Sequence, residues 1–254
     1  RTRFLMICKK RKFISSRNSN YFLSIRQIYT MRFVTVLFLI TLSCRAQEKT
    51  ETVEDKIVGY ISTFESFQFF NQLNIALEEY AEKRNWLESI PKTSTNVTGF
   101  AIGNGFFNGN KSYYDINLFY TSYKTYSSGF SNYGYSSREF RIRNLGLGFD
   151  YLITNKYLFN QIYLGGGIKY SRLSFYSLSQ FNSGWLVKDN YISLSPKLEY
   201  IPKYLKRRLF IGAQINLPLH QINITDLKKE MGTVNTSSYM WPCSFDISIK
   251  VCLL

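Results

Sequence analysis

The chain has few of the residues on which disulfide frameworks, metal sites and acid–base catalysis depend. It contains one His and four Cys among 254 residues, and two of those Cys precede residue 47. The other two, Cys243 and Cys252, lie nine residues apart in a segment that reads as one strand, so their side chains face opposite ways roughly 30 Å apart. Such a pair cannot form a bridge. We therefore expect no disulfide, no metal site and no cofactor.

Acidic residues are absent from the first 46 positions, which hold ten of the 32 Lys and Arg residues. The rest of the chain has 22 basic and 17 acidic residues, so its net charge is +5, whereas the whole sequence carries +15. A basic charge favours nucleic-acid binding only where the folded part carries it. Because the excess belongs to the leader, we expect no nucleic-acid partner.

Residues 31–46, "MRFVTVLFLITLSCRA", are typical of a signal peptide. A basic residue follows the Met, and the apolar stretch 33–42 is far shorter than the ~20 residues of a membrane-spanning helix. Small residues, Cys44 and Ala46, stand three and one positions before a cut that would leave Gln47 first. This pattern predicts export of the remainder.

Two alternatives concern the same leader. A lipoprotein signal that modifies Cys44 fits less well, because Leu42 stands two residues before it and such signals prefer Leu three before. Residues 1–30 carry eight basic residues and no acidic one, and we interpret them as an upstream in-frame extension that is not native structure. A genuine basic tail is the alternative. Residues 47–95 then form an N-terminal segment and residues 96–254 the main domain.

Apolar and polar residues alternate along most of the chain after residue 96. The last segment, "SFDISIKVCLL", shows this most clearly, and a period of two over roughly ten residues predicts strands with chemically different faces. A first strand is needed to give an even number. The predicted strands are 56–64, 97–107, 112–124, 138–153, 159–175, 189–201, 207–220 and 241–253.

Turn lengths also alternate along the chain. Short turns such as "FNGNK" are followed by long polar connections such as those at 125–137 and 175–189. This predicts an all-β fold, an antiparallel up-and-down barrel of about eight strands. One irregularity interrupts it: Phe140 and Ile142 have the opposite parity to Leu145 and Leu147, which predicts a β-bulge near residues 143–144.

The alternation fits either a soluble barrel, apolar inside, or a transmembrane barrel, apolar outside. The polar face favours the second, because Gly, Ser and Asn with opposed charges can fill a narrow lumen. Internal ion pairs are the expected role of these charges, and a channel lining is the alternative. The predicted lumen network is Asp115, Asp150, Lys169, Lys197, Glu199, Asp246 and Lys250, and the predicted interfacial aromatic residues are Tyr151, Tyr170, Tyr200 and Trp241.

Residues 66–89 have helical spacing. Apolar residues recur on one face, opposite Glu and Lys: Phe69, Phe70, Leu73, Ala76, Leu77 and Tyr80. The simplest interpretation is an amphipathic helix that packs against the barrel mouth. An interfacial helix, a plug and a partner-docking element are the alternatives.

The signal at 31–46, the strands "LGLGFDYLI" and "IYLGGGIKY" and the alternating last strand make the chain resemble the small outer-membrane β-barrel proteins of Gram-negative bacteria, the OmpA/OmpX-like superfamily. The resemblance covers residues 96–254. It implies the bacterial outer membrane as location, with outer-membrane lipids and the insertion machinery as partners. Such proteins usually end on an aromatic residue of the apolar face, whereas the apolar face ends here at Leu253.

The resemblance implies a structural, adhesive or surface-interaction role without catalysis, in which long extracellular loops contact an unknown ligand. Two other functions stay open. A lipid A-modifying acyl enzyme would use His220, with Asp226 and the pair 237–238 in the following loop. A soluble periplasmic ligand-binding barrel is the second.

Overall fold

The computed structural model describes residues 57–89, 91, 93, 95–108, 111–132, 134–154, 161–179, 183–202, 205 and 208–253. The predicted signal peptide and the extension before it lie outside these residues. In the described part, neither helix is long and apolar enough to cross a bilayer.

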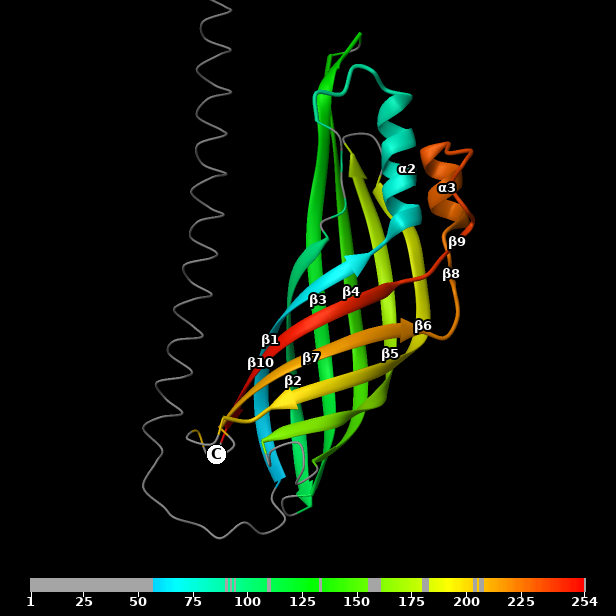
Figure 1. The fold of residues 1–254 in the computed structure, drawn as a ribbon. Helices are drawn as coiled ribbons and strands as arrows, with labels where there is room; N and C mark the ends of the chain where they lie inside the picture. Colours follow the sequence, from blue (N-terminus) through cyan, green and yellow to red (C-terminus); the bar gives the residue numbers. More distant parts are fainter. Residues whose placement is uncertain are drawn as a thin grey trace, which may run out of the picture. The chain divides into compact units, whose positions relative to one another are not determined.

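Eight antiparallel strands close into a barrel, which confirms the predicted fold (Figure 1). Around the ring the order is β1-β10-β7-β6-β5-β4-β3-β2, and β1 closes the ring by pairing with both β2 and β10. The strands are β1 (Ile57–Phe69), β2 (Asn96–Asn108), β3 (Ser112–Ser131), β4 (Gly134–Thr154), β5 (Ile162–Ser179), β6 (Ser183–Tyr200), β7 (Leu209–Pro218) and β10 (Cys243–Leu253).

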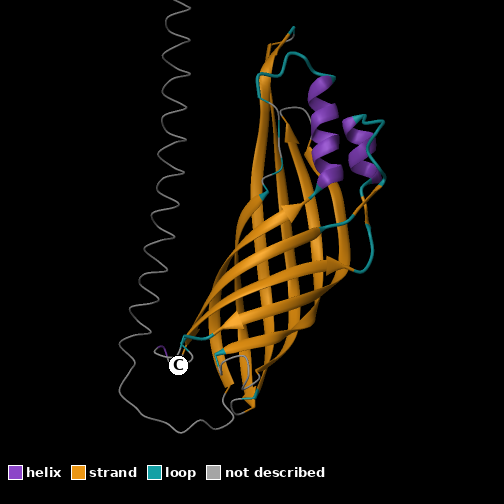
Figure 2. Ribbon diagram, in the orientation of Figure 1, coloured by secondary structure: helices purple, strands orange, loops and turns teal. Residues whose placement is uncertain are grey.

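The two ends of the barrel differ. At one, the turn end, lie the last residues of β2, β4 and β6 and the first residues of β3, β5 and β7. At the other, the helical end, lie α2 (Asn71–Glu82), α3 (Thr225–Met231) and the two-stranded ladder of β8 (Ile222–Asn223) and β9 (Tyr239–Met240), as Figure 2 shows. Strands β3 to β6 have 18 to 21 residues and the other four have 10 to 13, so the long strands continue past the ring at the helical end.

The prediction that residues 125–137 and 175–189 form long polar loops was therefore wrong. Most of their residues continue β3, β4, β5 and β6 as paired hairpins. These segments lack apolar alternation but are rich in Ser, Thr and Tyr, and Thr and aromatic residues suit a pleated, half-exposed surface.

The sidedness of each long strand reverses along its length. On the part of β4 nearer the turn end, which we call the lower part, Leu145 and Leu147 are exposed on the outer face. On the upper part, nearer the helical end, Phe140 and Ile142 are buried on the inner face. The same reversal occurs on the neighbouring strands, between Tyr120 and Tyr123 on β3, between Tyr170 and Leu173 on β5, and between Tyr191 and Ile192 on β6.

These reversal points lie in register across the sheet. Tyr120 is opposite Leu145, Leu147 is opposite Tyr170, and Tyr170 is opposite Ile192. Below this boundary the outer face is apolar, and the inner face carries buried charged and polar side chains together with an apolar layer at the turn end. Above it the inner face is apolar and packed, as in a water-soluble sheet.

The boundary also explains why the predicted β-bulge at residues 143–144 is wrong. The β3–β4 register runs without a shift through Ser122–Arg143 and Thr121–Asn144. The apolar residues change parity there because the core moves from one face of the strand to the other. A register shift does occur in the β5–β6 pair, between Phe175 and Tyr176.

Helix α2 packs against the inner face of the strand extensions. Its apolar face buries Leu73, Ala76, Leu77 and Tyr80 in a cluster with β4, β5, β6 and α3, and the rings of Tyr80 and Phe140 meet edge to face. The predicted helix over 66–89 was too long at both ends, because residues 66–69 pair with β2 and β10 as part of β1. Phe69, assigned to the helix face by its spacing, is instead an exposed residue of β1. The packing is that of a helix at the barrel mouth.

Candidate functional site

The inside of the barrel is closed at the turn end by an apolar layer. Tyr113 lies at its centre and stacks on Phe107 at 4.8 Å between ring centroids, with Phe210 and Tyr163 against its other sides. The full cluster comprises Val58, Tyr60, Phe107, Tyr113, Leu152, Tyr163, Ile201, Phe210 and Cys252.

A buried ion network lies immediately above the apolar layer. Lys197 Nζ is 2.9 Å from Asp115 Oδ2, 2.5 Å from Asp150 Oδ2 and 3.1 Å from Glu199 Oε1. Lys250 Nζ is 2.6 Å from Glu199 Oε1 and also contacts Asp115. Three carboxylates and two ammonium groups from β3, β4, β6 and β10 thus form one cluster.

Two tyrosine hydroxyls complete this network and were not predicted. Tyr60 donates a hydrogen bond to Asp115, and Lys250 Nζ donates one of 2.8 Å to the hydroxyl of Tyr113. Tyr113 has the same parity as Asp115, so the alternation indicated its inward position, whereas residues 56–64 show no alternation that would have placed Tyr60. Their role was missed because aromatic residues were assigned only to the outer face.

The two remaining members of the predicted lumen network lie further toward the helical end. Lys169 Nζ is 3.9 Å from Asp246 Oδ2, which also accepts hydrogen bonds from Gln214 and Asn216 at 2.7 and 2.6 Å. All seven predicted lumen residues are buried inside the barrel. A space of about 30 Å³ lies beside three of them, Lys169, Lys197 and Lys250, and has room for a water molecule or two.

The predicted interfacial aromatic residues all lie on the outer surface, where Tyr151, Tyr170, Tyr200 and Trp241 are exposed. Tyr151 packs against Tyr114 of the neighbouring strand, with 4.7 Å between their ring centroids. His220 is exposed just past β7, and its Nε2 lies 3.1 Å from the backbone oxygen of Asn190. Among the described residues, no carboxylate or hydroxyl lies within hydrogen-bonding distance of this imidazole.

The chain that follows α2 runs along the free edge of β3. Leu87 bridges to Gly129, and the backbone nitrogen of Glu88 donates to the Ser128 oxygen at 2.9 Å. Gly129 is required at this contact, because a Cβ there would lie 2.1 Å from the backbone oxygen of Trp86. This pairing covers an edge of the extended sheet and brings Trp86 to the tip of the β3–β4 hairpin.

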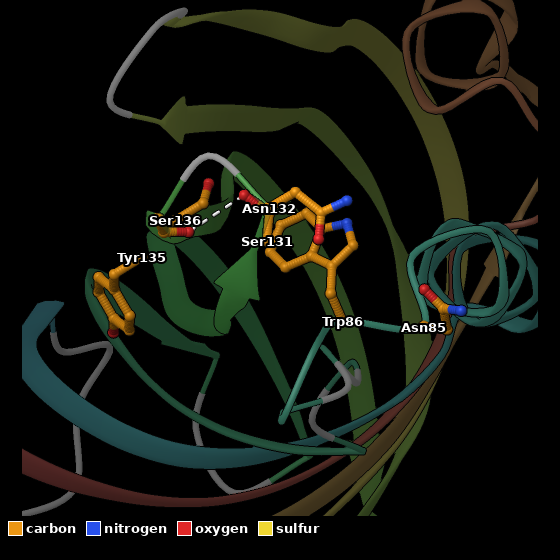
Figure 3. A pocket seen from close by; sticks show the side chains of 7 residues that line it. Asn85, Trp86, Ser131, Asn132, Tyr135 and Ser136 are labelled. Carbon is orange, nitrogen blue, oxygen red and sulfur yellow. Dashed lines mark hydrogen bonds between the residues drawn. The ribbon is translucent and has the colours of Figure 1, made fainter.

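An open pocket of about 500 Å³ forms between Trp86 and that tip (Figure 3). The tip turns at Gly134, whose φ of +109° favours glycine, and Ser131 donates a hydrogen bond of 3.1 Å to the Gly134 oxygen. The lining combines two aromatic side chains with amides and hydroxyls and includes no charged residue: Asn85, Trp86, Ser131, Asn132, Gly134, Tyr135 and Ser136.

Sequence reasoning did not single out this pocket. Its residues come from two segments about 45 positions apart in the chain, which the β3-edge pairing brings together. The signal that was available is composition, since the hairpin "TYSSGFSNYGYSS" consists largely of Tyr, Ser, Gly and Asn. These are the residues that antibody loops use for adaptable recognition.

No protein-family profile and no curated protein sequence matches this chain. Similar solved structures include Ail, the attachment invasion locus protein of Yersinia pestis, at 10% identity over 79% of this chain and 99% of that chain, with a TM-score of 0.41. Neisserial surface protein A matches at 10% identity over 77% of this chain and 96% of that chain, with a TM-score of 0.44. Outer membrane protein OprG of Pseudomonas aeruginosa matches at 10% identity over 78% and 94%, with a TM-score of 0.34. The fold assignment rests on the strand pairing of the chain itself.

Proposed function

We propose that the chain is an outer-membrane β-barrel protein that binds an extracellular ligand at its helical end and carries out no catalysis. The observation that supports this most is the in-register reversal of sidedness on β3 to β6. It separates an apolar-walled barrel from the part that we call the head, which consists of the extensions of β3 to β6, α2, α3 and the β8–β9 ladder. The occluded lumen argues against a pore, and the packed head supplies a rigid platform for recognition.

The pocket beside Trp86 is the proposed ligand site. Aromatic faces, amides and hydroxyls without a charged group suit a ligand that is itself uncharged, with both C–H faces and hydroxyls. A neutral oligosaccharide has that chemistry. The pocket volume of about 500 Å³ lies within the range of small-molecule sites and would hold one or two sugar units.

The location is tested by fractionation and by gel mobility. The detergent-extracted chain should run faster unboiled than boiled, because a closed barrel stays folded in cold detergent. A chain recovered in the soluble periplasmic fraction without detergent would overturn the proposal in favour of the soluble ligand-binding barrel.

The ligand site is tested with purified chain in detergent on an array of neutral oligosaccharides. Trp86→Ala should abolish binding to any sugar that the wild-type chain retains, since stacking on the indole is lost. Trp185→Ala is the matched control, because Trp185 is exposed on the outer face away from the pocket lining. Equal binding by the wild-type chain and Trp86→Ala would refute this site.

The enzyme alternative has less support. An acyl-transferring His needs an orienting carboxylate and a nucleophile within hydrogen-bond reach. The contact of His220 is with a backbone oxygen, and Asp226 stands at the start of α3 as a first-turn acid. A His220→Ala change should therefore leave the lipid A mass profile of expressing cells unaltered.

A further inference from the structure

The outer face of the strand extensions carries a contiguous patch of basic residues just above the apolar wall. We call it the basic rim: Lys124 on β3, Arg141 and Arg143 on β4, Arg172 on β5 and Lys188 on β6. Lys124 is directly opposite Arg141, and Arg172 and Lys188 follow on the next strands at diagonal positions, opposite Leu145 and Ser174. Diagonal neighbours on one face of a sheet lie roughly 7–8 Å apart.

The rim has more positive charge than its surroundings neutralise. Glu139 is the one acidic residue of outward parity in the described extensions of these strands, and it pairs with Arg141 and, at 3.5 Å, with Lys124. Burial alone would raise the pKa of Glu139, but the hydrogen bond from Arg141 and the charge of Lys124 lower it, so this carboxylate is ionised at neutral pH.

The other three cations lack such a partner. Arg143 and Arg172 form no ion pair with any residue that the structure describes, and the Nε of Arg143 is buried without a hydrogen bond. Lys188 lies over the ring of Trp185, with its Nζ 5.9 Å from the ring centroid. Like charges side by side on one sheet face are destabilising, so the arrangement favours an external anion.

The position of the basic rim along the barrel indicates where that anion should lie. Arg172 stands two residues above Tyr170, and Arg143 two residues above Leu145, the last outward apolar residues below the boundary. Two strand residues span about 7 Å. The guanidinium groups therefore lie at the level of lipid headgroups when the apolar wall is in the hydrocarbon layer.

We propose that the basic rim binds the phosphate groups of an anionic, multiply phosphorylated lipid in the leaflet next to the helical end. Arg143 and Arg172 make the main contacts, because the planar guanidinium pairs with phosphate oxygens in a bidentate manner. The proposal rests on the membrane location argued above and is independent of the Trp86 pocket. It makes the lipid a specific partner of one side of the barrel.

The test uses the full folded chain and bis-phosphorylated lipid A as the probe, with enzymatically dephosphorylated lipid A beside it. Binding is measured in mixed micelles by native mass spectrometry and by titration. The wild-type chain should retain the phosphorylated lipid and lose it on dephosphorylation. Each basic residue near a membrane surface contributes roughly a five-fold change in affinity, so Arg143→Ser with Arg172→Ser should weaken binding by about 25-fold.

Two further variants make the result specific. Arg143→Lys with Arg172→Lys keeps the charge and should restore part of the affinity. Lys111→Ser with Lys229→Ser removes two exposed charges at the turn end and on α3 and should change little. Unboiled gel mobility of every variant reports whether the barrel is folded.

The outcomes separate the two proposals. If the folded double Arg→Ser variant binds as tightly as wild type, or if dephosphorylated lipid binds equally well, the rim proposal is overturned while the outer-membrane location stands. The same holds if the Lys111 and Lys229 control loses as much affinity as the rim variant, because binding then follows total charge. A water-soluble chain overturns both proposals.

Discussion

Replacement of Lys250 by Met is the most direct test of the ion network inside the barrel. The ammonium group contacts Glu199 at 2.6 Å, the Tyr113 hydroxyl at 2.8 Å, and Asp115. Met has a similar length and is apolar, so the change removes the charge with little change in volume. The three carboxylates of the cluster would then face Lys197 alone.

The size of the effect follows from the buried charge left behind. In the wild-type cluster the carboxylates outnumber the ammonium groups by one, and in Lys250→Met they outnumber them by two. Removing one partner of a buried ion pair typically destabilises a protein by about 3–5 kcal/mol. With a urea dependence of roughly 2–3 kcal/mol per molar, the unfolding midpoint should fall by about 1–2.5 M.

The assay is urea unfolding of the refolded chain in detergent micelles, followed in parallel by unboiled gel mobility and tryptophan fluorescence. Adding Glu199→Gln returns the charge excess to its wild-type value, so the double variant should recover part of the lost stability. Lys229→Met, on the exposed surface of α3, is the control and should leave the midpoint unchanged. A Lys250→Met midpoint within about 0.2 M of wild type would refute the reasoning, since a buried charge excess of this kind cannot be free of cost.

Two other substitutions and a conductance measurement test the remaining parts of the structure. Leu77→Ala, at a position that is 0% exposed in the α2 cluster, should destabilise the head by about 2–5 kcal/mol and make α2 sensitive to protease while the barrel keeps its gel mobility. Gly129→Val should abolish pocket binding without unfolding the barrel, because its Cβ would meet the Trp86 backbone oxygen; retained sugar binding would contradict the proposed geometry. In planar bilayers the wild-type chain should show no stepwise conductance, and regular channel openings would contradict an occluded lumen.

The transmembrane part of the fold was accessible from sequence because each of its strands has one lipid-like and one lumen-like environment. On β10, Ile247 and Ile249 are exposed while Asp246 and Lys250 are buried, as their alternation indicated. The strand count also followed, since an even number required β1. Which lumen charges pair could not follow from parity, because register and barrel stagger decide which strands bring their side chains to the same height.

The structure of the head could not be predicted from the sequence in the same way. Its strands pack against helices on one face and are exposed to water on the other. Their buried residues, such as Leu173 and Phe175, therefore lie on the inner face, whereas the apolar residues of the barrel wall lie on the outer face. Helix α3 was missed as well: it has seven residues, and its end at Gly232, with a φ of +66°, is marked by little more than that glycine. Local sequence carries little signal for an element whose stability comes from burial of Leu227 and Met231 against other segments.

A change of apolar parity along one strand has two explanations, and the neighbouring strands distinguish them. A bulge adds a residue to a single strand, so the parity of its partners is unaffected and the register shifts by one. A change of environment shifts the apolar face of every strand at the same height. The residues around Ile142 and Leu145 behave in the second way, because the partners Tyr123 and Tyr120 on β3, and Phe175 and Tyr170 on β5, change with them. For a strand that leaves a membrane and continues, the aligned parity change therefore marks the membrane boundary itself, and the cations of the rim begin one outward position beyond it.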